Sequence, residues 1–254
     1  MIEKQIVKNR FGKSTDTYHQ QAKVQKKVAE KLVHLCLQLS TNKITRLLEI
    51  GCGTGFLTQK ILSEFTIKEY FINDMVDPEI MLETQIKSQL SYKTVQFYPG
   101  DAESIALPTN LDTIVSASCF QWFNNLERFF SKITPLINAT GILAFSTYGP
   151  ENFREIKHIL GTGLPYQSIE KIICLLKNDF EIFHSEEWQD ALKFETPIEV
   201  LKNIKSTGVN GISNKYMGKE KLQNFHSEYL KLYANQDDTV SLTYHPIIII
   251  ARKK

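Results

Sequence analysis

The sequence has 254 residues, of which 42% are hydrophobic and 23% charged, enough apolar material for the core of one large domain. This composition argues against a disordered chain, and a net charge of +2 is too small to predict a nucleic-acid-binding protein. No apolar stretch is long enough to span a membrane and the N-terminus lacks the apolar centre of a signal peptide, so we expect a cytoplasmic protein whose partners include neither membrane nor nucleic acid. The four cysteines show no C-x-x-C pair and no metal-ligand spacing, which predicts reduced thiols and no metal site.

Lysine and arginine are concentrated in two segments. Residues 1–31 contain eight Lys or Arg against three acids, and residues 193–231 contain seven Lys against four acids. If the two segments lie side by side they form a basic face for an acidic partner. The alternative is that they are solvated helix faces without a partner.

Apolar residues recur at helical intervals over residues 18–39, and polar residues at 14–16 are candidate N-caps. A helix here would place Tyr18, Gln21 and Gln25 on one face. Polar groups on such a face suggest a ligand or solvent beside it. For Tyr18, a ligand contact and plain packing are equally compatible with the pattern.

The stretch LLEIGCGTGFLT, residues 47–58, predicts a strand, a glycine loop and a helix in succession. Gly51, Gly53 and Gly55 have no Cβ to hold the backbone away from a ligand, and their N–H groups lie near the positive end of the following helix. A dinucleotide-binding fingerprint would need glycine at position 56, where this chain has Phe. The loop therefore favours a nucleotide-like ligand without a pyrophosphate.

Glu49 precedes the first glycine, and its carboxylate is better suited to a cationic ligand than to a phosphate. With Glu49, the stretch resembles motif I of class I S-adenosylmethionine-dependent methyltransferases, E/D-x-G-x-G-x-G. The resemblance implies an α/β, Rossmann-like fold with a mostly parallel seven-stranded sheet flanked by helices. It also implies that S-adenosyl-L-methionine, with S-adenosyl-L-homocysteine as product, contacts Glu49, Cys52 and the three glycines. The alternative is a glycine-rich turn without a ligand.

A buried-strand candidate at residues 70–73 ends at Asp74, 19 residues after Gly55. One helix and one strand return the chain to the side of the first loop, so a carboxylate here can accept hydrogen bonds from both ribose hydroxyls. Asp77 is the rival, because NDMVDPEIM has one residue more than the D-x-S-x-x-M pattern of the methyltransferases. We prefer Asp74 because it ends the strand directly, and we expect Met75 beside the same ligand.

Residues 94–101 predict a third strand that ends in a Gly-Asp turn. In the methyltransferase resemblance, Asp101 accepts the adenine amino group and the N–H of Ala102 reaches the ring. The alternative for Asp101 is an aspartate that only forms the turn.

A fourth strand is predicted at residues 111–116, followed by SASCFQWFNN. Open α/β sheets bind ligands where the chain leaves the carboxyl end of a central strand, which places Ser116 at the cofactor and Gln121 and Trp122 at the active-site mouth. Trp122 could instead be a core residue. An aromatic face beside a sulfonium is worth about 0.5–2 kcal/mol, which favours the ligand role.

The next segment predicts a helix, a Pro-to-Gly turn at residues 138–141 and a fifth strand at 142–147. A further helix is predicted at residues 151–159, with Arg154 in its first turn near the carboxyl edge of the sheet. Another helix is predicted at residues 169–176.

The remainder predicts a strand region, a helical insertion and a last strand with four consecutive isoleucines that suit burial on both faces. We interpret the chain as a single domain in which the helical insertion acts as a lid. The expected parts are an N-terminal helical segment (1–40), a Rossmann-like core (41–194), the lid (195–237) and the last strand (238–254).

Six segments together resemble the malonyl-acyl-carrier-protein O-methyltransferases of biotin synthesis. They are FGKSTDTYHQQAKVQ, LLEIGCGTGFLT, CFQWFNN, FSTYGPENFREI, IKSTGVN and LTYHPIIIIAR. The chain departs from the family pattern at Thr15, where Ala is usual, by the extra residue near Asp74, and in N-A-T-G where P-G-G is usual.

The resemblance implies methyl transfer to the free carboxylate of malonyl-acyl-carrier protein, or of malonyl-CoA, by a monomer. It also implies that Tyr18, Gln121 and Trp122 form part of the catalytic face and that Gln25 contacts the cofactor. We expect Arg154 to pair with the acceptor carboxylate, because it is the only Arg that follows a strand end on the catalytic side and a guanidinium can hold a carboxylate bidentately. The alternative is that Arg154 is an ordinary Arg on a helix surface. A carboxyl group with a pKa of about 4 is ionised at neutral pH, so the reaction needs no general base.

Three other functions remain compatible with the sequence. A methyltransferase for another small carboxylate would share motif I and the lid but would need no carrier-protein surface. A quinone or sterol C-methyltransferase would need a base and an apolar pocket, which the polar Gln, Tyr and Arg set disfavours. A non-catalytic nucleotide-binding scaffold fits the same fold.

Overall fold

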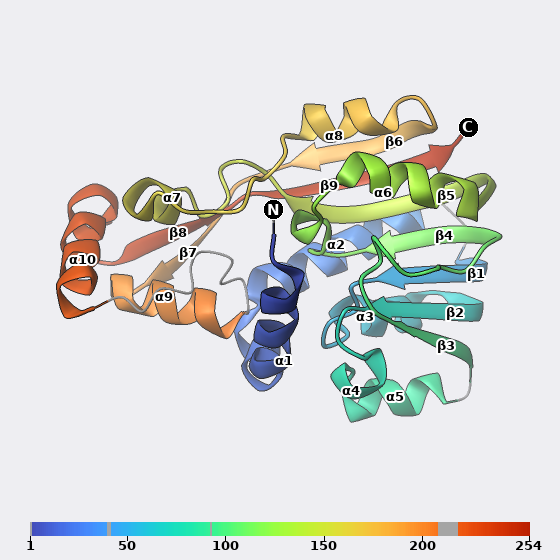
Figure 1. The fold of residues 1–254 in the computed structure, drawn as a ribbon, viewed down its shortest axis with the longest axis horizontal. Coiled ribbons are helices and arrows are strands. Elements are labelled where there is room, and N and C mark those ends of the chain that lie inside the picture. The colour runs from blue at the N-terminus through green and yellow to red at the C-terminus, as the bar shows by residue number, and fades with distance from the viewer. Residues whose placement is uncertain (1, 40–41, 92, 208–217) are drawn as a thin grey trace.

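The computed structural model describes residues 2–39, 42–91, 93–207 and 218–254, without the side chains of 13–17, 19 and 20. In this part of the chain, seven strands form one sheet in the order β3-β2-β1-β4-β5-β9-β6, and β9 is antiparallel to both of its neighbours (Figure 1). The expected α/β fold with a mostly parallel seven-stranded sheet is confirmed. The strands are β1 Lys43–Ile50, β2 Thr66–Asp74, β3 Thr94–Pro99, β4 Leu111–Ser116, β5 Ile137–Tyr148, β6 Phe180–Glu187 and β9 Pro246–Lys253.

The four isoleucines of β9 show why the sheet is covered on both faces. Ile247 and Ile249 belong to one buried cluster and Ile248 and Ile250 to another, as expected for side chains that alternate across a strand. On the first face lie α6 (Leu126–Ile133) and α8 (Ile169–Leu176), and on the second lie α2 (Lys23–Leu39), α3 (Phe56–Glu64) and α5 (Thr84–Leu90). The short elements α4 (Pro78–Met81), η1 (Phe120–Trp122) and η2 (Thr134–Leu136) lie in the connections.

A second, two-stranded sheet lies beyond the carboxyl ends of the main parallel strands, at the left of Figure 1. It pairs β7 (Asp190–Phe194) with β8 (Val240–Tyr244), and α7 (Arg154–Leu160), α9 (Pro197–Ser206) and α10 (Lys219–Tyr233) pack around it. The N-terminal helix α1 (Lys4–Gln21) lies between these helices and the main sheet and contacts α9. The helical insertion thus occurs between β7 and β8, although most of its glycine-punctuated part, 208–217, lies outside the described residues.

Several predicted boundaries differ from those in the structure. The helix expected over residues 18–39 is two helices that meet at Ala22, and positions 14–16 lie inside α1 rather than at an N-cap. The polar sequence of α1 carries little helical periodicity, so tertiary packing determines where it forms. The turn expected at 138–141 lies within β5, where Thr140 has φ 65° and the register against β4 shifts.

The expected last strand, 238–254, is also two strands that belong to different sheets. β8 pairs with β7, and the chain then passes through His245 into β9 of the main sheet. The strand region expected at 180–194 is divided in the same way between β6 and β7. The chain passes from β6 to β7 and from β8 to β9 at the same end of the main sheet. The second sheet and its helices therefore lie beyond the carboxyl ends of β1, β4 and β5.

Candidate active site

A pocket lies at the carboxyl ends of β1, β2, β3 and β4, where parallel α/β sheets bind their ligands. Its floor is formed by Ile50, the glycine loop and the residues that follow each strand. α1 covers it from above with Val7, Phe11 and Tyr18. The pocket therefore depends on an N-terminal helix as well as on the sheet.

The glycine loop is fixed by backbone contacts to the end of β2. The amides of Gly51 and Cys52 donate to the carbonyl of Asn73 at 2.9 and 3.1 Å. A Cβ on Gly51 would lie 2.4 Å from the Sγ of Cys119, whereas a Cβ on Gly53 would meet no atom within 4 Å. Both glycines have positive φ and line the pocket, so the loop requires glycine at these positions.

Gly55 has a different role from the one expected. It caps the N-terminus of α3 at φ 100°, and it does not line the pocket. A Cβ on it would lie 2.4 Å from the Cδ1 of Ile86 and 2.9 Å from the Cδ2 of Leu82. Gly55 therefore allows α5 to pack closely against the start of α3.

Asp74 lies on the pocket wall at the end of β2. Its Oδ2 accepts from the Gly53 amide at 2.9 Å and its Oδ1 from the Val76 amide at 3.0 Å. Burial raises the pKa of Asp74, and the backbone hydrogen bonds offset only part of that effect. Met75 also lines the pocket, whereas Asp77 caps α4 by accepting from the Glu79 amide at 3.0 Å. The geometry thus favours Asp74 over Asp77 as the group that faces a ligand.

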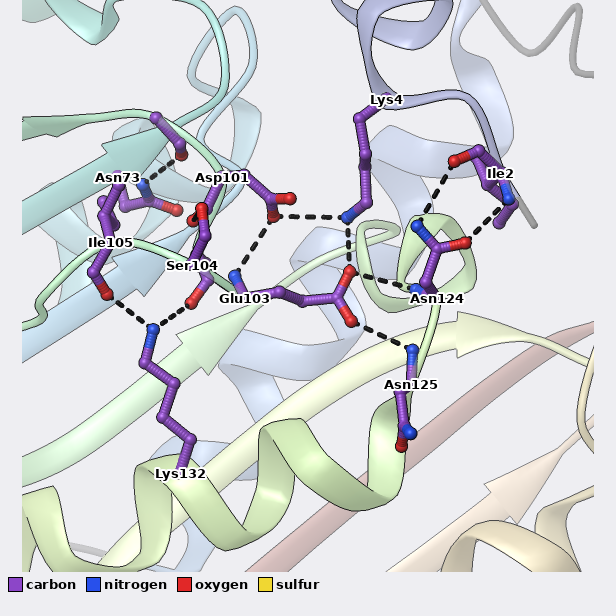
Figure 2. Close-up of polar contacts among 12 residues, drawn as sticks. Ile2, Lys4, Asn73, Asp101, Glu103, Ser104, Ile105, Asn124, Asn125 and Lys132 are labelled. Atoms are coloured by element: carbon purple, nitrogen blue, oxygen red, sulfur yellow. Dashed lines mark hydrogen bonds and ion pairs between the residues drawn. The ribbon is translucent and has the colours of Figure 1, made fainter.

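Asp101 and Ala102 line the pocket after β3, in the turn whose Gly100 amide donates to the carbonyl of Asp74 at 2.8 Å. The Oδ1 of Asp101 accepts from the Glu103 amide at 3.1 Å and from the Nζ of Lys4 at 3.2 Å (Figure 2). The carbonyl of Ala102 accepts from the Nζ of Lys132 at 2.7 Å. Asn73 joins this turn to β2, because its side chain donates to the carbonyl of Gly100 at 2.9 Å.

Two buried polar atoms on the pocket wall lack a hydrogen-bond partner among the described residues: the Oε1 of Gln25 and the Oγ1 of Thr54. Leaving a buried polar group unpaired costs about 1–3 kcal/mol, so such groups in a cavity indicate a polar ligand. Thr54 follows Gly53 in the loop, and Gln25 lies in the first turns of α2. Because both atoms lie on the wall of the same pocket, they suit a ligand with an amino-acid-like group.

Aromatic rings enclose the mouth of the pocket. The Tyr18 ring stacks on Phe56 with centroids 5.7 Å apart, and Phe11 lies 5.8 Å from Tyr18 and 6.1 Å from Trp122. Burial, followed by the charges of neighbouring groups such as Asp74, raises the pKa of Tyr18. Tyr18 is therefore a neutral hydroxyl at physiological pH, and the aromatic wall suits a cation.

Two predicted cofactor contacts support the pocket from behind rather than line it. The buried carboxylate of Glu49 accepts from the Oγ1 of Thr58 at 2.9 Å and from the hydroxyl of Tyr70, and burial raises the pKa of Glu49 to about 7. The Oγ of Ser116 donates to the carbonyl of Ile50 at 2.8 Å. These bonds join the ends of β1, β2, β4 and α3, so both residues fix the backbone that forms the pocket floor.

Two predicted catalytic residues also lie off the pocket. The side chain of Gln121 donates to the carbonyl of Ser118 at 2.6 Å and accepts from the Oγ1 of Thr147 at 3.3 Å, and it lines a neighbouring cleft between α6 and α8. The side chain of Arg154 is 48% exposed and lies 3.8 Å from Glu151 and 3.7 Å from Glu155. Arg154 begins α7, which follows the left-handed Phe153 and leads away from the main sheet, so its side chain lies outside this pocket.

Several lining residues were missed from the sequence. Thr54 could have been found from its place between two glycines of the loop. The lining residues of the β4 connection could have been found from their place in SASCFQWFNN, and Phe11 from the segment that it begins; they are Phe11, Ala117, Ser118, Cys119 and Phe123. Nothing in the sequence singled out Lys4, Val7 and Lys8 of α1.

Comparison with known proteins gives full-length relatives for this chain. A methyltransferase-domain family model matches residues 41–209. The malonyl-[acyl-carrier protein] O-methyltransferase of Bacteroides thetaiotaomicron is 38% identical over 263 residues, which cover 100% of this chain and 99% of that protein. The enzyme of the same name from Acinetobacter baylyi is 35% identical, with 99% of this chain and 98% of that protein covered.

The chain belongs to the malonyl-[acyl-carrier protein] O-methyltransferase family. Among its relatives, the Bacteroides fragilis protein is 38% identical over 99% of this chain, and the chain spans about half of that longer protein, 51%. Among the described residues, no helix is long and apolar enough to cross a membrane.

Solved structures support the fold of this family member. The YcgJ protein of Bacillus subtilis superposes with a TM-score of 0.59 at 15% identity, covering 88% of this chain and 98% of that chain. The N-methyltransferase NodS of Bradyrhizobium japonicum, in complex with S-adenosyl-L-homocysteine, superposes with a TM-score of 0.53 at 12% identity, covering 89% and 85%. The pocket fits S-adenosyl-L-methionine, with strand-end carboxylates, unpaired polar atoms and an aromatic mouth.

Proposed function

We propose that this protein transfers a methyl group from S-adenosyl-L-methionine to the free carboxylate of malonyl-acyl-carrier protein, as in an early step of biotin synthesis. The observation that carries the proposal is the full-length similarity, at 35–38% identity, to enzymes that bear this name. The alignments cover the N-terminal helix and the insertion as well as the sheet.

Each end of the pocket takes a different part of the cofactor in this proposal. Asp74 accepts from the ribose hydroxyls, and Asp101 with the amide of Ala102 takes the adenine. Gln25, Thr54 and the amides of the glycine loop bind the amino and carboxylate groups at the other end. This assignment satisfies the two buried atoms that lack partners and places the cation beside the aromatic mouth.

The chemistry requires positioning rather than proton transfer. When bound, the cofactor supplies an electrophilic methyl group, and the malonyl carboxylate is already ionised at neutral pH. Tyr18, Phe11 and Trp122 close the site from α1 and η1, which excludes water and restricts the acceptor. Correct orientation of two reactants is worth up to about 7–11 kcal/mol, so a base is not needed for a large rate enhancement. The neutral hydroxyl of Tyr18 is our candidate donor to the acceptor carboxylate.

The acidic carrier protein docks, in this proposal, on the face where α1 meets α9. The two helices contact each other, and Lys8, Lys202 and Lys205 are exposed on them. This placement brings the two basic segments together. The insertion between β7 and β8 then acts as the lid over the acceptor.

The test compares malonyl-carrier protein, malonyl-CoA and free malonate as acceptors at several salt concentrations. We expect malonyl-carrier protein to be the preferred acceptor. The double substitution of Lys202 and Lys205 by Glu should raise the KM for malonyl-carrier protein and leave the KM for malonyl-CoA unchanged. Lys68→Glu, an exposed charge reversal near the amino end of β2, is the control and should change neither. Equal activity on free malonate would contradict the carrier-protein substrate and indicate a small-carboxylate methyltransferase.

A further inference from the structure

The first residues of the described chain are fastened to the rim of the pocket by two sets of contacts (Figure 2). The backbone amide of Ile2 donates to the Oδ1 of Asn124 at 2.7 Å, and the Nδ2 of Asn124 donates back to the carbonyl of Ile2 at 3.2 Å. Two residues later, the Nζ of Lys4 lies 2.6 Å from the Oε2 of Glu103 and 3.2 Å from the Oδ1 of Asp101.

Glu103 connects the two sets. Its carboxylate also accepts from the amides of Asn124 and Asn125, at 3.0 and 2.9 Å. Burial alone would raise the pKa of Glu103, but the hydrogen bonds from Lys4, Asn124 and Asn125 outweigh it and lower the pKa. Glu103 is therefore ionised at neutral pH and holds the start of α1 to the loop after η1.

These contacts are shielded from solvent, unlike most lysine ion pairs on the surface. The side chains of Lys4 and Glu103 are 18% and 17% exposed, and the Nζ of Lys4 lies 4.7 Å from the centre of the Phe123 ring. In contrast, the side chain of Lys27, which pairs with Asp190, is 68% exposed. A shielded, charge-assisted contact contributes more than an exposed one, so this fastening is strong enough to hold a helix end.

We infer that Lys4, Glu103 and Asn124 form a clasp that holds α1 over the cofactor pocket and that must open for the cofactor to exchange. Three observations carry the inference: Lys4 lines the pocket, it touches Asp101, and the rest of α1 covers the same pocket through Val7, Phe11 and Tyr18. The inference rests on the proposed cofactor site and adds to it a route of entry and release. Because Asp101 contacts the clasp, adenine recognition and closure are linked through one carboxylate.

The experiment measures the dissociation rate of S-adenosyl-L-homocysteine by stopped-flow displacement in the full chain. Lys4→Met and Asn124→Ala should each increase the dissociation rate by about tenfold, the effect of losing about 1.4 kcal/mol. Asn124→Ala is the sharper variant, because it removes both bonds to Ile2 without touching Asp101. Gln5→Ala is the matched control. Gln5 is an exposed neighbour of Lys4, and among the described residues its side chain bonds locally, to Asn9, so the rate of this variant should equal that of the wild type.

A second measurement does not depend on the cofactor. Amide hydrogen exchange over residues 2–11 should be faster in both clasp variants than in the wild type, with the strands of the main sheet unchanged. Wild-type rates of dissociation and exchange in both variants would overturn the proposed clasp. Faster rates in Lys4→Met alone would overturn it too, because they would indicate a charge effect on Asp101. Failure of the wild type to bind the cofactor would instead contradict the proposed function, and the exchange data would still decide whether the clasp holds α1.

Discussion

Glu49 offers a direct test of how the buried polar groups beneath the glycine loop respond to pH. Its carboxylate is fully buried between Thr58 and Tyr70, and burial raises its pKa from 4.5 to about 7. The native protein therefore retains a proton between these two values that the unfolded chain releases. Its contribution to stability is fully present below the unfolded pKa and is lost as the pH rises through the folded pKa.

The size of the effect follows from the two pKa values. Since one pKa unit corresponds to about 1.4 kcal/mol, raising the pH from about 5 to about 8 should lower the free energy of unfolding through this group by about 2–3 kcal/mol. Glu49→Gln removes the titration but keeps the shape of the side chain. The difference in unfolding free energy between the variant and the wild type should therefore shift in favour of the variant by that amount over this pH range.

Urea unfolding followed by tryptophan fluorescence at a series of pH values measures this difference. Glu127→Gln, which changes an exposed carboxylate on α6, is the control and should follow the wild type at each pH. A difference between Glu49→Gln and wild type that does not change with pH would refute the reasoning, because it would mean that Glu49 has the same proton affinity in the folded and unfolded states.

Three further predictions concern the pocket and its surroundings. Asp74→Ala should weaken S-adenosyl-L-homocysteine binding by about 1–3 kcal/mol in a calorimetric titration, and Asp77→Ala should leave it unchanged; the reverse order would overturn the ribose assignment. Gly55→Ala should lower the free energy of unfolding by about 1–3 kcal/mol in urea, because the new Cβ would meet Ile86 at a positive φ; a value near zero would show that the contact relaxes. Arg154→Ala should keep kcat/KM within about twofold of the wild type, since the side chain lies outside the pocket, and a large loss in a steady-state assay would return Arg154 to the active site.

The floor of the pocket could be predicted from the sequence because its elements are local. The strand, loop and helix around Gly51 occupy consecutive residues, Asp74 ends a strand of recognisable apolar pattern, and Asp101 follows the end of another. The carboxyl ends of neighbouring parallel strands must meet at one edge, so residues far apart in the sequence could be placed together.

The roof of the pocket could not be predicted in the same way. α1 has a polar sequence, and its packing on the pocket through Val7 and Phe11 depends on contacts with distant elements. The pairing of β7 with β8 joins segments on either side of a long insertion, which no local pattern specifies. The position of Arg154 outside the pocket could not be predicted either, because the direction of a side chain at a helix start depends on the preceding backbone, here the left-handed Phe153.

Mass spectrometry of malonyl-carrier protein, after incubation with the purified protein and S-adenosyl-L-methionine, shows whether the methyl group reaches this acceptor. We expect the carrier to gain one methyl group, as an ester on the distal malonyl carboxylate, and the Asp74→Ala variant to form it more slowly. An unmodified carrier, in the presence of protein that binds the cofactor, would contradict the proposed methyl transfer.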